Sequence, residues 1–191
     1  MLESATFLKD YRCFKEGFSL SFRKGINVLV GDQGTGKSSL LQLLGEPCKK
    51  EDRKEFLKIK TSEKMSTAYF DTEKHNPRLR GPNPNGTSEA YLAGIQMMWM
   101  SHGEVNNIVL SHLPKKTPAL ILVDEPDTAL SPKSIVKLVG TYQDLSLKGY
   151  QFIVSIHNPL FMSLVGEVLD ISTGKWIDAK KYLKKQIGFD V

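Results

Sequence analysis

The stretch that decides how this chain folds lies near its N-terminus and reads INVLVGDQGTGKSSLLQLL over residues 26–44. The apolar run over residues 26–30 predicts a buried strand, and the four leucines at positions 40 to 44 have helical spacing. The turn between them carries three glycines in the pattern G-x-x-x-x-G-K-S. Such a turn lets backbone N–H groups point at an anion, and the helix that follows adds its positive N-terminal end. The stretch therefore predicts a phosphate-binding loop.

This loop indicates a nucleoside triphosphate with Mg²⁺, most simply ATP, although no motif that reads a base separates ATP from GTP. Lys37 is expected to reach the β- and γ-phosphates, and the Ser38 hydroxyl to bind Mg²⁺. A glycine-rich turn without a ligand is the alternative, and the position between a strand and a helix disfavours it. The residues expected to hold the nucleotide are Gly31, Asp32, Gln33, Gly34, Thr35, Gly36, Lys37, Ser38 and Ser39.

A second apolar run, over residues 119–123, ends in two carboxylates, Asp124 and Glu125. Continuous apolar runs of this length are typical of central parallel strands, whose carboxyl ends line the ligand crevice of an open sheet. Asp124 is expected to hold Mg²⁺ through water, and Glu125 to orient and deprotonate the attacking water. Alone, the pair could be a solvated strand end or a helix cap, and the phosphate-binding loop makes the catalytic interpretation the stronger one.

Further strands are predicted over residues 5–8, 18–22, 67–70, 152–155 and 168–171. Helices are predicted over 49–60, over 88–100 with Ser88 as the N-cap, and over 132–147. A loop is predicted over 75–86. The basic tail over 175–185 is predicted to be partly helical. Strands that alternate with helices predict an α/β fold with a largely parallel sheet flanked by helices. We expect an N-terminal antiparallel β portion and a short helical insertion in addition.

Composition is that of a globular protein: 191 residues, 40% of them hydrophobic, with a net charge of +5. There is neither an apolar run of membrane-spanning length nor a signal-peptide pattern, so we expect a cytoplasmic protein. The two cysteines, Cys13 and Cys48, form no C-x-x-C pair and indicate neither zinc nor a disulfide framework. The basic residues gather over 49–60 and 175–185, where they are solvated faces or nucleic-acid contacts.

Several motifs in a fixed order resemble those of the ABC-type ATPases. The chain reads MSHGE at residues 100–104, DEP at 124–126, ALSP at 129–132 and FIVSIH at 152–157. These stretches are similar to the family's signature, acidic strand end, D-loop and switch strand with its histidine. The segment YRCF at residues 11–14 resembles the start of the SMC, RecF and OLD-like branch, and the chain is most similar to its small stand-alone members.

The resemblance implies a P-loop NTPase with an ABC-type ATPase head, formed by a single domain over residues 1–191 with a helical and signature subregion over about 46–113. It implies an ATP-dependent homodimer with composite active sites. Ser101, Gly103 and Glu104 would bind the γ-phosphate held by the other subunit. His157 would contact the γ-phosphate and orient the water, and Arg12 would lie near the nucleotide. With Glu125 and Lys37, His157 completes the expected catalytic set.

Two features depart from the family pattern. The glutamine of the Q-loop has no counterpart, and Asp71 or Glu73 stands at about its place, as a substitute or as a strand-end cap. His102 replaces a glycine of the signature. By analogy with the relatives, we expect an effector protein such as a nuclease as partner, in DNA repair or phage-related defence, with DNA contact possible and no membrane insertion. A non-hydrolytic switch, a transporter motor subunit and a small-molecule kinase are the alternatives.

Overall fold

The computed structural model describes residues 1–45, 55–71 and 113–188. Its main sheet has six strands in the order β5-β6-β7-β3-β8-β9. All neighbours in it are parallel except β8 and β9, which are antiparallel. The strands are β3 (Ile26–Val30), β5 (Ser66–Asp71), β6 (Ala119–Asp124), β7 (Tyr150–Ser155), β8 (Glu167–Asp170) and β9 (Lys175–Asp178).

A second, antiparallel sheet has three strands in the order β2-β1-β4. They are β1 (Leu2–Phe7), β2 (Ser19–Ser21) and β4 (Leu57–Thr61). The helices of the described part are α1 (Lys37–Gly45), α6 (Pro132–Leu147), α7 (Pro159–Val165) and α8 (Ala179–Ile187). The predicted α/β fold with a largely parallel sheet and an N-terminal antiparallel portion is confirmed.

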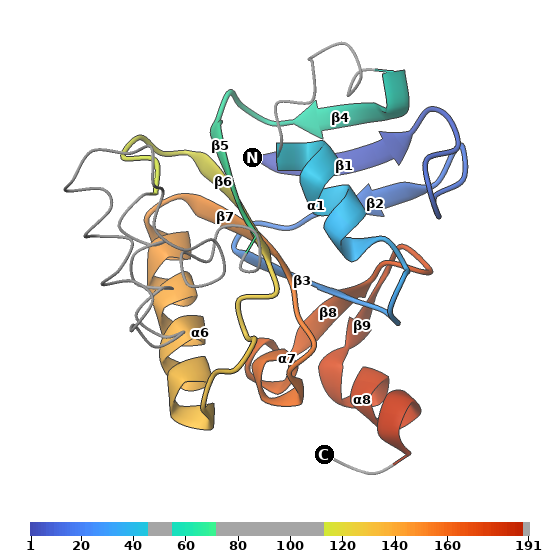
Figure 1. Ribbon diagram of the computed structural model, residues 1–191. Coiled ribbons are helices and arrows are strands. Elements are labelled where there is room, and N and C mark those ends of the chain that lie inside the picture. The colour runs from blue at the N-terminus through green and yellow to red at the C-terminus, as the bar shows by residue number, and fades with distance from the viewer. Residues whose placement is uncertain (46–54, 72–112, 189–191) are drawn as a thin grey trace, which may run out of the picture.

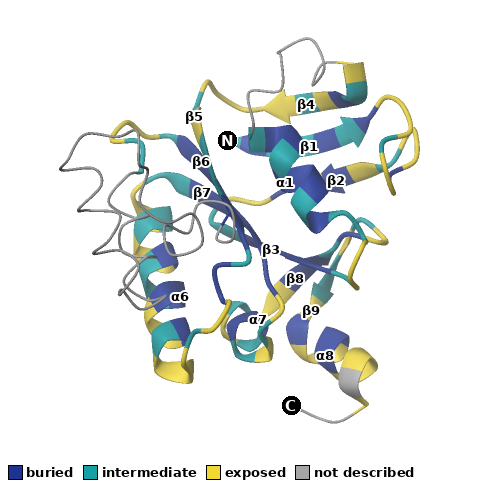
Figure 2. Ribbon diagram, viewed as in Figure 1, coloured by how far each residue is buried: buried dark blue, intermediate teal, exposed yellow. Residues whose placement is uncertain are grey.

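The main sheet is buried on both faces, as Figure 2 shows for its central strands. Helices α6, α7 and α8 cover one face, and α1 with the antiparallel sheet covers the other (Figure 1). Alternation along each strand distributes the side chains: Val28 and Ile121 face the α6 layer, whereas Leu29 and Leu122 face α1. Two hydrophobic cores therefore share one sheet and hold its strands in register.

The expected surface helix over residues 49–60 is wrong at residues 57–60, which lie in β4. The sequence there, LKIKT, alternates apolar and polar residues, with Leu57 buried and Lys58 and Lys60 exposed. Such alternation suits a strand with one face on a core, and pairing with β1 satisfies its backbone. The high lysine content concealed this period of two.

Several predictions concern residues outside the described part of the chain: the helix over 49–54, the loop over 75–86 and the helix over 88–100. Strands β4 and β5 fall within the expected helical and signature subregion over 46–113. The division of the chain into that subregion and a surrounding single domain stays a prediction. In the described residues, no helix combines the length and apolarity that crossing a lipid bilayer requires.

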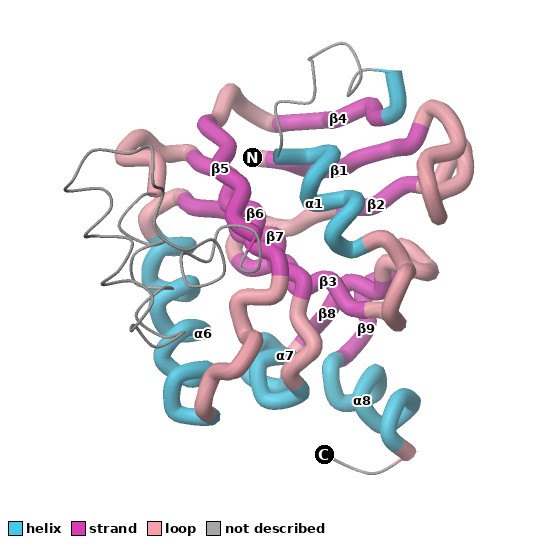
Figure 3. The backbone as a smooth tube through the Cα atoms, viewed as in Figure 1, coloured by secondary structure: helices cyan, strands magenta, loops and turns pink. Residues whose placement is uncertain are grey.

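The parallel strands bring the predicted functional segments to one edge of the main sheet. Strands β3, β6 and β7 are neighbours, and Asp124 at the end of β6 stands in register with Ser155 at the end of β7. The tube view shows the loops after β3, β6 and β7 emerging on the same side of the molecule (Figure 3). Segments more than a hundred residues apart in sequence thus meet at the carboxyl ends of the strands, where open α/β sheets bind ligands.

Candidate functional site

The loop after β3 has the backbone of a phosphate-binding turn. Gly31, Gly34 and Gly36 all have positive φ, of 146°, 79° and 95°. At Gly36 a side chain would meet a second obstacle, because a Cβ there would lie 2.7 Å from Cε2 of Phe14. Glycine is therefore required at this position both by the backbone and by the close approach of the N-terminal segment.

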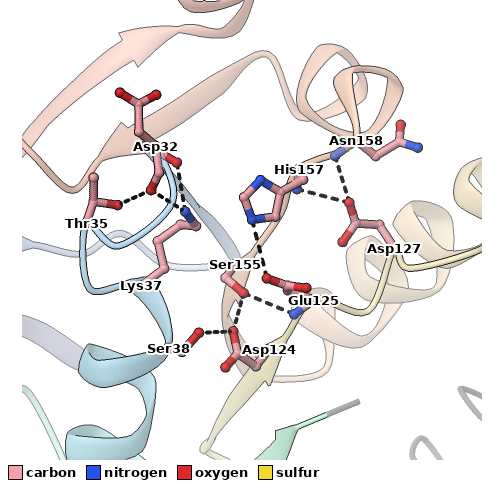
Figure 4. A network of polar contacts seen from close by, with 11 residues as sticks. Asp32, Thr35, Lys37, Ser38, Asp124, Glu125, Asp127, Ser155, His157 and Asn158 are labelled. Carbon is pink, nitrogen blue, oxygen red and sulfur yellow. Dashed lines mark hydrogen bonds and ion pairs between the residues drawn. The ribbon is translucent and has the colours of Figure 1, made fainter. Parts of the chain in front are cut away.

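Lys37 is the first residue of α1, and it is buried, with 6% of its surface exposed. Its ammonium group donates to the carbonyl of Gly31 at 2.7 Å and of Asp32 at 3.0 Å, as Figure 4 shows in part. Burial lowers the pKa of Lys37, and the nearby carboxylates, chiefly those of Glu125 and Asp124, oppose this shift. The cation thus lies over the loop, among three carboxyl groups that favour its charged form.

Ser38 and Asp124, the two residues predicted to hold Mg²⁺, lie against each other. The Ser38 hydroxyl donates to Oδ1 of Asp124 at 3.2 Å. Ser155, on β7, donates its hydroxyl to the same Oδ1 and accepts the backbone N–H of Glu125 at 3.0 Å. One hydroxyl therefore holds both acidic residues at the end of β6 (Figure 4).

Glu125 and His157 form the second pair of the site. Nε2 of His157 lies 3.3 Å from Oε1 of Glu125, and both side chains are partly exposed. Glu125 has a φ of 50°, a left-handed conformation that non-glycine residues seldom adopt. The conformation turns the chain sharply at the end of β6, and the carboxylate points toward the histidine in Figure 4. Strain of this kind persists where the surroundings hold it, here the bond from Glu125 N–H to Ser155.

Arg12 and Cys13 bring the segment before β2 against the loop. Arg12 also has positive φ, of 53°, and its guanidinium donates to the Ser39 hydroxyl on α1 at 2.6 Å. The thiol of Cys13 donates to the carbonyl of Thr35 at 3.1 Å. These contacts place Arg12 against α1, and its position near a bound nucleotide stays a prediction.

Two adjoining cavities open at this edge of the sheet. A cavity of about 180 Å³ is lined by Gln33, Gly34, Gly36, Lys37, Ser38, Ser39, Glu125 and His157. A larger one, of about 430 Å³, shares Gln33, Glu125 and His157 with it and extends to Tyr182 and Gln186 of α8. Most of the residues predicted to bind phosphate line the smaller cavity, whereas Gly31 and Asp32 line the larger one. Glu125 and His157 line both cavities.

Asp71 ends β5 and stands in register with Asp124. It is buried, with the Tyr69 hydroxyl 3.3 Å from its Oδ2. Its place beside the predicted metal ligand fits either a substitute for the Q-loop glutamine or a strand-end cap. Glu73 and the signature residues Ser101, His102, Gly103 and Glu104 lie outside the described residues.

Sequence reasoning missed two residues of the site, Ser155 and Asp127. Ser155 belongs to the predicted switch strand, but only the register with β6 places its hydroxyl beside Asp124. Asp127 follows the acidic pair and accepts the backbone N–H groups of His157 and Asn158. A third carboxylate within four residues was the available signal, and its spacing pointed to no particular function.

Comparison with known proteins agrees with the geometry. One family model, described as "AAA domain", matches residues 7–78. A second, described as "AAA domain, putative AbiEii toxin, Type IV TA system", matches residues 100–163. Together they include the phosphate-binding loop, the acidic pair and His157.

Curated relatives are ABC proteins. ABC transporter G family member 8 of Dictyostelium discoideum is 30% identical over 125 residues, which are 64% of this chain and 19% of that protein. The macrolide export ATP-binding/permease protein MacB of Campylobacter jejuni is 26% identical over 204 aligned positions, covering 88% of this chain and 32% of that protein. The chain thus spans between a fifth and a third of the length of these relatives.

Among solved structures, "An inward-facing conformation of a putative metal-chelate type ABC transporter" matches with a TM-score of 0.52. The match covers 100% of this chain and 90% of that one at 17% sequence identity, so it supports the fold alone. The family models, the ABC relatives and the arrangement of the loop and acidic pair all support the same family, the P-loop ATPases of the ABC/AAA type.

Proposed function

We propose that the protein hydrolyses ATP with Mg²⁺ and that its active site is completed by a second copy of the chain. The observation that carries the proposal is the pair of Glu125 and His157, 3.3 Å apart on the wall of the cavity that the phosphate-binding loop lines. A binding loop alone would suit any nucleotide-binding protein. A carboxylate and a histidine beside it supply a base and a group that orients water.

The residues at the loop fit a nucleoside triphosphate and a magnesium ion. Backbone N–H groups from Gly31 to Ser39 and the Lys37 ammonium would hold the phosphates, with Arg12 beside them. Ser38 and Asp124 offer adjacent oxygen atoms, the donor type that Mg²⁺ prefers when phosphates supply further ligands. When bound, Mg²⁺ supplies charge neutralisation at the β- and γ-phosphates.

The proposed reaction is hydrolysis of the bond between the β- and γ-phosphates. Glu125 accepts a proton from water while the water oxygen bonds to the γ-phosphorus, and the bridging oxygen leaves with ADP. His157 orients the water and contacts the γ-phosphate, and Lys37 stabilises the charge that develops on the phosphate oxygens. The products are ADP and inorganic phosphate, with the proton held first by Glu125.

The dimer part of the proposal rests on the family resemblance. Ser101, Gly103 and Glu104 of one copy would contact the γ-phosphate bound by the other, so ATP would join two copies and hydrolysis would separate them. Such a cycle needs a partner to act upon. We propose that the protein is cytoplasmic and that its partner is an effector protein, for instance a nuclease in DNA repair or phage-related defence, with DNA as a further ligand.

A second candidate is the motor subunit of an ABC transporter. The observation in its favour is that the curated relatives named above are transport proteins by their descriptions. Two features favour the first candidate. The Q-loop glutamine has no counterpart, and Asp71 at the end of β5 stands at about its place. The segment around Arg12 resembles the start of the SMC, RecF and OLD-like branch. Co-purification of the tagged protein with an integral membrane protein of its own cell would favour the transporter.

Replacement of Glu125 by glutamine tests the proposal. We expect the Glu125→Gln protein to bind MgATP, to release phosphate about 10²- to 10⁴-fold more slowly than wild type, and to accumulate as a dimer on sizing. Glu167→Gln is the matched control, because within the described part of the chain the Glu167 side chain forms an exposed ion pair with Arg23, away from the site. A Glu125→Gln protein that stays monomeric in ATP at every concentration would contradict the composite site. Wild-type dimers without phosphate release would instead identify a non-hydrolytic switch.

A further inference from the structure

Asp127 lies two residues beyond Glu125, on the turn that follows β6, and its side chain is only 7% exposed. Its Oδ2 accepts two backbone N–H groups from the segment after β7, that of His157 at 3.0 Å and that of Asn158 at 2.7 Å (Figure 4). A carboxylate that accepts two N–H groups forms charge-assisted hydrogen bonds, which are stronger than neutral ones. The turn carrying Glu125 is therefore joined to the segment carrying His157.

The other oxygen of this carboxylate, Oδ1, is buried and has no hydrogen-bond partner in the described structure. A buried polar atom without a partner destabilises the folded state. Asp127 is thus a poor choice for stability alone, since its burial leaves half of the carboxylate unsatisfied. A role of the Asp127 contact with His157 and Asn158 in the site would explain why this destabilising carboxylate is present.

His157 depends on this contact because it stands between two regular elements. Strand β7 ends at Ser155, and the last sheet-like bond is that of the Ile156 N–H to Leu29 at 3.3 Å. Helix α7 begins at Pro159, capped by the side chain of Asn158. The two residues between, His157 and Asn158, have their N–H groups on Asp127.

The same contact sets the distance between the two groups of the proposed reaction. Glu125 is held from one side by the Ser155 hydroxyl, and the backbone of His157 is held from the other by Asp127. The 3.3 Å separation of the His157 and Glu125 side chains is the result. Without Asp127, the His157 backbone would exchange its bond for one to water and the ring would sample other positions.

We propose that Asp127 is a positioning residue, which holds His157 at the distance from Glu125 that water activation requires. The inference rests on the hydrolytic function proposed above and adds a residue to which the family resemblance assigns no function. The carboxylate works through the backbone of His157 and makes no contact with nucleotide.

Two substitutions separate positioning from folding. Asp127→Ala removes the acceptor, and we expect kcat for ATP to fall by roughly 10- to 100-fold, the loss typical of a misplaced catalytic group. Affinity for a fluorescent N-methylanthraniloyl-ATP should stay within about twofold of wild type, because Asp127 does not line the phosphate cavity. Asp127→Asn keeps an oxygen acceptor, and we expect it to restore kcat to within about threefold of wild type.

The control is Asp144→Ala, which removes an exposed carboxylate from α6 and should leave kcat and affinity unchanged. NMR of the histidine rings gives a readout that does not depend on turnover. The His157 resonance, assigned with a His157→Gln protein, should shift in Asp127→Ala and return toward its wild-type position in Asp127→Asn.

The outcomes separate this inference from the function on which it rests. Wild-type turnover in Asp127→Ala, or turnover as low in Asp127→Asn as in Asp127→Ala, would overturn the positioning role. Equal losses of kcat and of nucleotide affinity would do the same, since they indicate a general collapse of the site. If wild type releases no phosphate, the hydrolytic proposal fails, and an unchanged His157 resonance in Asp127→Ala would then reject the positioning as well.

Discussion

At the scale of single residues, the site depends on one hydroxyl, that of Ser155, to which the sequence motifs assigned no function. Ser155 is fully buried. Its hydroxyl donates a hydrogen bond to the Asp124 carboxylate and accepts one from the backbone N–H of Glu125. It thereby holds the predicted metal ligand and the backbone of the predicted base at once. Because Glu125 has a left-handed backbone, loss of this bond would let the turn relax toward a more common conformation.

Ser155→Ala should therefore lower ATP turnover by about tenfold and raise the Mg²⁺ concentration needed for half-maximal turnover, with little effect on folding. The measurement is phosphate release across a magnesium titration. Ser146→Ala is the control, since the Ser146 hydroxyl donates to a helix carbonyl at the other end of the sheet. A Ser155→Ala protein whose magnesium dependence matches wild type would show that Asp124 keeps its place unaided.

At the scale of elements, a buried glutamine joins the two sheets. Gln151 of β7 is 0% exposed, accepts the N–H of Leu2 at 2.8 Å, and donates to the carbonyls of Leu2 at 2.8 Å and Arg23 at 2.9 Å. Its side chain is the hydrogen-bond partner of backbone groups in β1 and in the segment before β3. The antiparallel sheet, which supports the segment carrying Arg12, is anchored through this side chain.

Gln151→Met keeps the volume and removes all three bonds. We expect it to lower the free energy of unfolding by about 3 kcal/mol, since buried backbone groups lose their partners. Urea denaturation measures the change, and Gln143→Met, at an exposed position of α6, should alter stability by less than about 0.5 kcal/mol. A loss at Gln151 no larger than at Gln143 would mean that water replaces the side chain.

At the scale of the whole molecule, the described parts of the two basic regions lie apart. Lys58 and Lys60 belong to β4 on the antiparallel sheet. The tail over 175–185 begins in β9 and continues in α8, whose exposed lysines are at positions 180, 181, 184 and 185. Figure 1 shows β4 and α8 at opposite ends of the molecule. Of β4 and α8, α8 is the one that borders the larger cavity of the site, through Tyr182, Leu183 and Gln186.

If DNA is a further ligand, as proposed, α8 is the surface through which it can influence ATP turnover. We expect Lys181→Glu with Lys185→Glu to weaken binding of a labelled duplex and to reduce the slope of log K against log salt by about 2, one for each lost phosphate contact. Lys133→Glu with Lys137→Glu on α6 makes the same charge change at the same spacing and should leave the slope unaltered. Equal effects from both pairs would indicate net charge rather than a binding surface.

The local sequence was enough to predict the elements that carry the motifs. The strand–turn–helix at residues 26–44 and the strand before Asp124 were predicted because hydrophobic runs and glycines act over a few residues. β4 was missed because its lysines suggested a solvated helix, and α7 because its seven residues are too few to show a helical period. Both owe their conformation to neighbours that are distant in sequence.

For the site, the sequence by itself determined which residues can do the chemistry: Lys37 and Ser38 in the loop, Asp124 and Glu125 after a buried strand, and a histidine after another. Their types and short spacings carry that information. Only the tertiary structure decided what holds them in place, since the order of β6, β7 and β3 and their register set Ser155 beside Asp124 and Asp127 beside His157. Those contacts join positions about thirty residues apart in sequence. A single sequence does not contain the distances between strands, because they depend on how the whole sheet packs between its two cores.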